Sequence, residues 1–182
     1  MSKRTIILIA LLVIVSAALL YTAAFQNKKQ SDQMQPMVTP VVVAHTVLSL
    51  IPETTAQNSV DININSMGDN VTAVQAELVY DPMVIRNVRI TQGTFFPTPI
   101  VLFNQIDPKA GRISYAIGIH PLDQPQKGLG TVATIAYDKV YGAKGSVTLT
   151  FLPKTKVTAE GVAQSVLKTA NSLTITAPTG TK

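Results

Sequence analysis

The stretch Val71-Thr-Ala-Val-Gln-Ala-Glu-Leu-Val-Tyr-Asp-Pro82 decides how the rest of the chain is interpreted. One set of its side chains is apolar and recurs at every second position: Val74, Ala76, Leu78 and Tyr80. A period of two predicts a β-strand with one buried face and one outward face. Pro82 ends the strand because proline has no N–H to donate to a neighbouring strand. The sequence therefore predicts a central strand of a β-sandwich, and its outward face is the first place to look for function.

Eight further short segments alternate in the same way or are rich in β-branched residues, and Gly, Pro, Asn or Asp separate them. They are residues 41–51, 60–64, 84–91, 100–106, 113–119, 129–137, 147–151 and 173–176. Residues 159–169 have no clear period and leave room for a short helical turn. About nine short strands without a long amphipathic helix predict an all-β, two-sheet antiparallel sandwich.

The N-terminal segment Ile6 to Phe25 contains 20 residues without a charge, a glycine or a proline. Roughly 20 apolar residues span a bilayer as a helix, and Lys3 and Arg4 before them favour a cytoplasmic N-terminus. The alternative is a cleaved signal peptide with small residues around Thr22 to Ala24. The uninterrupted length favours a single-pass membrane anchor with the C-terminal domain extracellular. If the segment is cleaved, the domain is secreted.

The expected organisation therefore has four parts: a transmembrane helix or signal peptide over 1–25, a polar linker over 26–40, a β-sandwich over 41–177 and a tail over 178–182. The linker contains two prolines and no apolar period, which is typical of a flexible tether.

Composition excludes several classes of function. The chain has 182 residues, a formal charge of +5 and no cysteine, so no disulfide or reactive thiol is available. From Val41 onward, eleven Lys/Arg stand against nine Asp/Glu, a net of +2. Four basic residues instead flank the hydrophobic segment, and no arginine-rich run follows, so a nucleic-acid partner is not expected.

The residues that carry catalysis or bind metals are sparse. His45 and His120 are the only histidines and lie far apart in the sequence, and no Gly-x-Ser-x-Gly motif is present. Asp107, Asp123 and Asp138 are the remaining candidates for paired catalytic carboxylates, but all three have turn-like contexts in which Asp caps the backbone. No catalytic, cofactor-binding or metal-binding residues are therefore expected, and the chain is not predicted to be an enzyme.

Several motifs follow one another in a set order. They are Asp61-Ile-Asn-Ile-Asn65, Val74-Gln-Ala-Glu-Leu-Val-Tyr-Asp-Pro82, Gly93-Thr-Phe-Phe96, Gly111-Arg-Ile-Ser-Tyr-Ala116 and Gly130-Thr-Val-Ala-Thr-Ile135. This ordered set, spread over 41–177, resembles the cohesin domain family. The resemblance implies a nine-stranded antiparallel jelly-roll sandwich, related in fold to some carbohydrate-binding modules. It also implies a non-catalytic module that binds dockerins and assembles extracellular enzymes, with the calcium carried by the dockerin.

The resemblance also implies a binding face. By position, its contacts are Ala73, Gln75 and Glu77 on the strand before Pro82, together with Ser114, Ala116 and Gly118 on the strand after Arg112. Better-known cohesins often carry Asn and Asp where this chain has Ala73 and Gln75.

Two other functions remain open at this point. One is a carbohydrate-binding module with a polysaccharide ligand, since the fold is shared, but such platforms usually need flat aromatic surfaces. The chain has no Trp, aromatic residues are 5% of the total, and Tyr80 and Tyr115 fall on core faces. The other is a structural or adhesive cell-surface protein. A cohesin-like module connected with polysaccharide degradation is the favoured interpretation.

Overall fold

The computed structural model describes residues 14–22, 43–54, 56–143 and 146–175. Residues 14–22 are helical, and no helix within the described ranges is both long enough and apolar enough to cross a membrane. Most of the segment from Ile6 to Phe25 lies outside the described residues, as do the predicted linker and tail, so the membrane anchor stays a prediction. Residues 42–182 form one compact unit.

The described residues of this unit form eleven β-strands. They are β1 (Thr46–Pro52), β2 (Ser59–Asn65), β3 (Val71–Tyr80), β4 (Ile85–Gln92), β5 (Ile100–Asp107), β6 (Arg112–Gly118), β7 (Leu129–Lys139), β8 (Val147–Phe151), β9 (Lys156–Ala159), β10 (Leu167–Asn171) and β11 (Leu173–Ile175).

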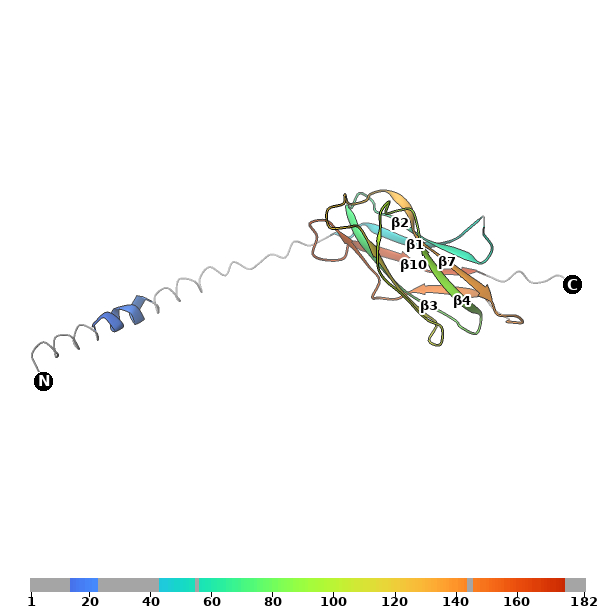
Figure 1. Ribbon diagram of the computed structural model, residues 1–182, viewed down its shortest axis with the longest axis horizontal. Coiled ribbons are helices and arrows are strands. Elements are labelled where there is room, and N and C mark those ends of the chain that lie inside the picture. Colours follow the sequence, from blue (N-terminus) through green and yellow to red (C-terminus); the bar gives the residue numbers. More distant parts are fainter. Residues whose placement is uncertain (1–13, 23–42, 55, 144–145, 176–182) are drawn as a thin grey trace, which may run out of the picture. The chain divides into compact units, whose positions relative to one another are not determined.

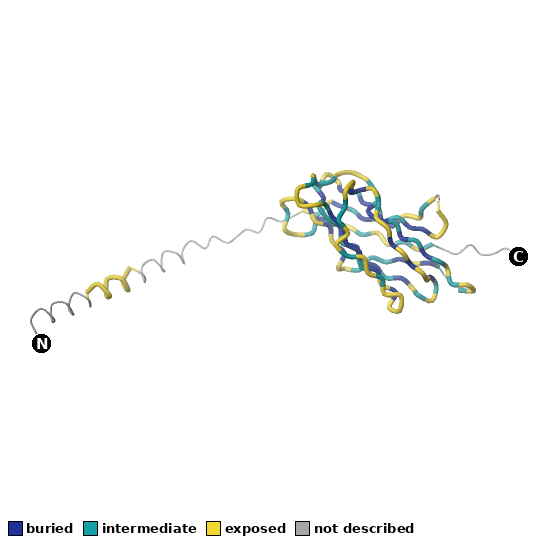
Figure 2. Tube along the Cα trace, viewed as in Figure 1, coloured by how far each residue is buried: buried dark blue, intermediate teal, exposed yellow. Residues whose placement is uncertain are grey.

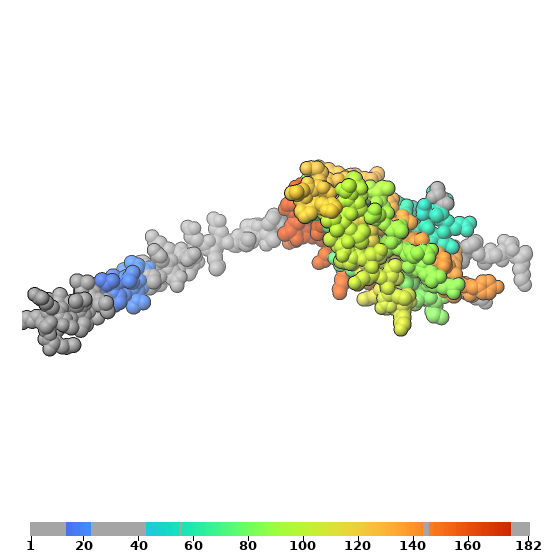
Figure 3. Space-filling view, viewed as in Figure 1, coloured from blue at the N-terminus to red at the C-terminus, as the bar shows by residue number. Residues whose placement is uncertain are grey.

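The strands form the two predicted sheets. One has the order β10-β1-β2-β7-β4, and β10, β1, β2 and β7 lie side by side in Figure 1. The other has the order β11-β8-β3-β6-β5, with β9 also paired to β3. In the space-filling view the green-to-yellow part of the chain, which includes β4 to β6, covers much of the visible surface of the unit (Figure 3).

Two details of the predicted sandwich are wrong. The count of nine strands misses β9, which ends at Ala159, and β10, which begins at Leu167. Residues 159–169, for which the sequence left room for a helical turn, contain no helix. The sheets are also not wholly antiparallel, because β10 runs parallel to β1. β9 has four residues and β10 has five, which is too short for either strand to show a clear period.

The period-two pattern of β3 is confirmed. Val74, Ala76 and Leu78 are almost completely buried, whereas the residues between them are half-buried. Figure 2 shows the same alternation of buried and less buried positions along several other strands, and the burial patterns of β1 and β2 are examples. Complete burial of an aliphatic side chain contributes roughly 1.5–3 kcal/mol, so the alternation fixes which face of each strand joins the core.

β3 is paired on both of its sides. It pairs with β6 along one side from Ala73 to Val79, and on its other side with β9 and then β8. The turn after it is held by Asp81, whose side chain accepts a hydrogen bond from the Met83 N–H at 2.8 Å. β3 is therefore fixed on both sides and at its end.

One buried hydroxyl has no partner within the described part of the chain. Tyr115 lies on the inner face of β6, is 1% exposed, and its hydroxyl makes no hydrogen bond there. Burial also raises the pKa of Tyr115. An unsatisfied buried hydroxyl is destabilising, since it has lost its hydrogen bonds to water.

We therefore expect Tyr115→Phe to raise the free energy of unfolding by about 1 kcal/mol, because it removes the unpaired group and keeps the ring. Urea unfolding followed by circular dichroism would measure this. Tyr137→Phe is the matched control, since the Tyr137 hydroxyl is not among the buried unpaired groups, and no gain is expected from it. A loss of stability in Tyr115→Phe would contradict the prediction.

Candidate partner-binding face

The six residues predicted to contact a partner lie together on the outer side of β3 and β6. The register joins them in three direct cross-strand pairs: Ala73 with Gly118, Gln75 with Ala116, and Glu77 with Ser114. We call these six residues the β3–β6 face. Direct cross-strand neighbours have Cβ atoms about 5 Å apart, so the face is a continuous patch.

A hydrogen-bond network orders the polar half of the β3–β6 face. The Ser114 hydroxyl donates to Glu77 Oε2 at 2.6 Å, and the Gln75 amide donates to Glu77 Oε1 at 3.0 Å. Hydrogen bonds to an ionised carboxylate are shorter and stronger than neutral ones. The two bonds hold the half-buried Glu77 carboxylate in one orientation.

The backbone of Glu77 is fixed as well. Between β8 and β9 the chain leaves the sheet, and there the Thr155 side chain takes the place of a neighbouring strand. Its hydroxyl accepts a hydrogen bond from the Glu77 N–H and donates one to the Glu77 carbonyl, each at 3.1 Å. Leu152 N–H donates to the same carbonyl at 2.7 Å. Glu77 is thus held through both its backbone and its side chain.

Ala116 and Gly118 lie on the outward side of β6, but Ala116 is only 3% exposed and Gly118 is buried. Each is the smallest residue in its row of cross-strand neighbours. Ala116 lies between Gln75 of β3 and a residue of β5, and Gly118 lies between Ala73 of β3 and a residue of β5. Larger neighbours therefore shield them, and the apolar half of the face is a shallow floor.

Sequence reasoning missed one aromatic neighbour of this floor. Phe103 of β5 is directly opposite Ala116, and Ile100 is opposite Gly118. A β-bulge between Val101 and Phe103 shifts the alternation along β5, so a strict period of two places Ile100 and Phe103 on opposite sides although both lie beside this floor. The short strand β9 adds Lys156 opposite Gln75.

The three aspartates that were candidates for catalysis each accept a hydrogen bond from another group of the protein. Asp107 accepts hydrogen bonds from the backbone N–H groups of Ala110 and Lys109, which lower the pKa of its carboxyl. Asp123 accepts a hydrogen bond from Thr98. Asp138 lies within β7, not in the predicted turn, and accepts a hydrogen bond from the side-chain amide of Asn87. Each carboxylate therefore has a structural role.

Of the two histidines, His45 lies 3.5 Å from an Asp69 carboxylate oxygen. In the described ranges, no group of three or more His, Cys, Asp or Glu residues is arranged to hold a metal ion.

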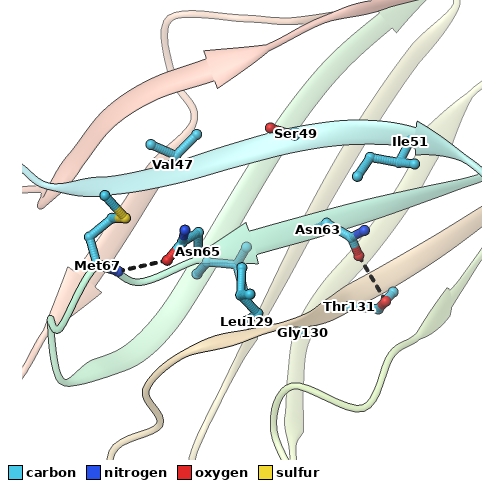
Figure 4. A pocket seen from close by; sticks show the side chains of 10 residues that line it. Val47, Ser49, Ile51, Asn63, Asn65, Met67, Leu129, Gly130 and Thr131 are labelled. Atoms are coloured by element: carbon cyan, nitrogen blue, oxygen red, sulfur yellow. Dashed lines mark hydrogen bonds between the residues drawn. The ribbon is translucent and has the colours of Figure 1, made fainter.

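A second concave surface lies on the other sheet, on the outer side of β1, β2 and β7. Its volume is about 600 Å³, and Figure 4 shows the residues that line it. The register places Ser49, Asn63 and Thr131 in one polar row, and Val47, Asn65 and Leu129 in the row beside it. We call this surface the β1–β2–β7 groove. None of its lining residues is charged.

The amide groups in this groove have defined orientations. Asn63 Oδ1 accepts a hydrogen bond from the Thr131 hydroxyl at 2.8 Å, and Asn65 Oδ1 accepts one from the Met67 N–H at 3.1 Å (Figure 4). The Ser49 hydroxyl oxygen accepts one from the Asn171 amide. The NH₂ groups and the Ser49 O–H remain available to donate to a ligand, and each of these oxygens keeps a second lone pair that can accept.

The solved structures that are similar to this chain are cohesin domains. The third cohesin of ScaC from Acetivibrio cellulolyticus, solved with the ScaB dockerin, is 15% identical over 73% of this chain and 100% of that chain, with a TM-score of 0.59. CaCohA2 from Clostridium acetobutylicum is 17% identical over 74% and 92%, with a TM-score of 0.53. The OlpA cohesin from Clostridium thermocellum, also solved with a dockerin, is 10% identical over 73% and 99%, with a TM-score of 0.55.

These likenesses confirm the predicted resemblance at the level of the fold: residues 42–182 contain a cohesin-like β-sandwich. No protein-family model matches the chain, and no curated protein matches it.

The close approach of β3 and β6 at one end of the β3–β6 face depends on Gly118. A Cβ atom there would lie 2.9 Å from both the Ala73 Cβ and the Thr72 carbonyl oxygen, closer than real Cβ atoms come. We expect Gly118→Ala to lower the free energy of unfolding by about 1–3 kcal/mol, because the two strands must separate. Denaturant unfolding would measure the loss.

The double variant Ala73→Gly/Gly118→Ala tests this cause. It removes the Ala73 Cβ and leaves the Thr72 carbonyl in place, so part of the lost stability should return. The free energy of unfolding of the double variant is expected to be higher than the value obtained by adding the effects of the two single substitutions. If the effects of the two single substitutions on the free energy of unfolding simply add, residues 73 and 118 do not clash sterically.

Proposed function

We propose that this protein is a non-catalytic, cohesin-like module whose β3–β6 face binds a dockerin-type protein module. The observation that carries the proposal is the β3–β6 face itself. It is a flat, ordered patch on a sheet that resembles the sheet of domains solved together with dockerins. Ala116 and Gly118, which larger neighbours shield, add no projecting side chain to this face.

The proposal includes the location. The uncharged segment from Ile6 to Phe25, with basic residues before it, supports display of the module outside the cytoplasm on a single membrane anchor. The proposed role is to hold a dockerin-bearing protein, with calcium bound by the dockerin, at the cell surface. Such a partner is expected to take part in polysaccharide degradation.

A pull-down with dockerin-bearing proteins from the source organism tests the binding face. We expect Gln75→Arg to reduce retention at least tenfold, because a bulky charge enters a contact that should exclude it. Gln75 is half-buried at the middle of the face, so the variant should still fold. Thr91→Arg is the matched control, since Thr91 is exposed on β4 of the other sheet.

Equal retention by wild type and Gln75→Arg would contradict the assigned face. Failure of wild type to retain any dockerin-bearing protein would contradict the dockerin partner and would favour a structural or adhesive role.

One observation favours carbohydrate binding as a second candidate function, located in the β1–β2–β7 groove. The groove has no charge, and it presents aligned donors between the aliphatic side chains of Val47 and Leu129. The hydroxyl oxygens of a sugar can accept hydrogen bonds from these donors. A neutral polysaccharide is therefore a ligand class that fits the groove.

Sedimentation with insoluble cellulose tests this candidate, with polygalacturonate as the anionic comparison. The double variant Asn63→Asp/Asn65→Asp keeps both accepting oxygens and removes both donors. If the groove binds the neutral glycan, the variant should bind about tenfold more weakly, the effect of two lost hydrogen bonds. Thr148→Ala, on the other sheet, should not change binding. Equal cellulose binding by the double variant would contradict the assignment.

A further inference from the structure

The Glu77 carboxylate has no positive partner on the described surface. Both of its oxygens accept hydrogen bonds from neutral groups, Gln75 and Ser114. An ion pair within the described ranges joins His45 and Asp69, and Glu77 takes part in none there. A carboxylate oxygen has room for a second hydrogen bond, so each oxygen of Glu77 can accept another donor.

A partner that covers the β3–β6 face removes water from this carboxylate. Removing water from an unpaired charge is strongly unfavourable, and the side chain cannot easily turn away, because its backbone and both oxygens are fixed. A favourable complex therefore has to supply a compensating positive charge at this point.

We propose that Glu77 is the specificity-determining residue of this face, and that the partner module presents a Lys or Arg side chain to it from a helix. This inference rests on the proposed dockerin-type function and adds the chemistry of the partner's central contact. Glu77 is only half-buried on this outward side, so a long cationic side chain of a docked helix can reach its carboxylate.

Two positive side chains lie near Glu77 and do not replace the partner's charge. Lys156 is opposite Gln75, and Arg112 is opposite Val79, so both are diagonal neighbours of Glu77. Both are exposed, and neither forms an ion pair within the described ranges. Their long side chains can move aside into solvent when a partner docks, whereas Glu77 cannot. The fixed negative charge, not the mobile positive ones, therefore sets the requirement on the partner.

A display library of dockerin variants tests the inference and does not require the natural partner. The library is built on the dockerin of the CaCohA2 complex, with the exposed positions of its helices randomised, and it is panned against the full chain. Against wild type, retained dockerins should be enriched in Lys or Arg at one helix position. Against Glu77→Lys, the same position should be enriched in Asp or Glu.

Affinities of individual retained dockerins give the magnitude. Glu77→Gln keeps a hydrogen-bonding side chain and removes the charge, and it should bind a Lys- or Arg-bearing dockerin on the order of thirty-fold more weakly than wild type. Thr150→Gln is the control, because Thr150 of β8 lies on the same sheet, opposite Val79, and carries no charge. Unchanged thermal unfolding of each variant shows that the fold is kept.

The outcomes separate the two proposals. If the library yields no dockerin that binds wild type, while its parent dockerin binds CaCohA2, the proposed function fails. If dockerins bind wild type and Glu77→Gln equally, without enrichment of Lys or Arg, the proposed function stands and the role of Glu77 is overturned. A switch of the selected charge with Glu77→Lys supports both.

Discussion

Pairing of β3 on both of its sides is the constraint on which the rest of this structure depends. β6 pairs with one edge, and β8 and β9 share the other. This fixes the strand's rotation, because a shift by one residue would expose Val74, Ala76 and Leu78 together. The same alternation that buries these residues turns Gln75 and Glu77 outward. Stability of the core and composition of the β3–β6 face are thus set by one register.

The two outer surfaces of the sandwich have different chemistry. The β3–β6 face centres on a fixed carboxylate beside a floor of small residues, whereas the β1–β2–β7 groove has no charge and offers amide and hydroxyl donors. A charged, shallow surface suits a protein partner that brings its own complementary charge. An uncharged groove with aligned donors suits a neutral ligand rich in oxygen. The two candidate functions therefore concern separate surfaces and can be tested independently.

Departure from the better-known cohesins gives the β3–β6 face its particular character. Ala73 and Gln75 stand where those domains often carry Asn and Asp, so the polar groups expected at this end of the strand are replaced by a methyl group and an amide. The negative charge instead lies at Glu77, and the amide of Gln75 helps to orient it. The cohesin-like fold is kept while the charge on the face has a different position.

The sequence by itself determined the all-β class and the inner and outer sides of β3, because alternation is a local property of each strand. The six positions of the face follow from the resemblance to cohesins and not from alternation. Only the tertiary structure decided their surroundings. Ser114 reaches Glu77 across 37 positions of sequence, Thr155 reaches its backbone across 78, and the bulge in β5 brings Phe103 beside Ala116. These contacts depend on register between distant strands, which core packing sets and which no local pattern records.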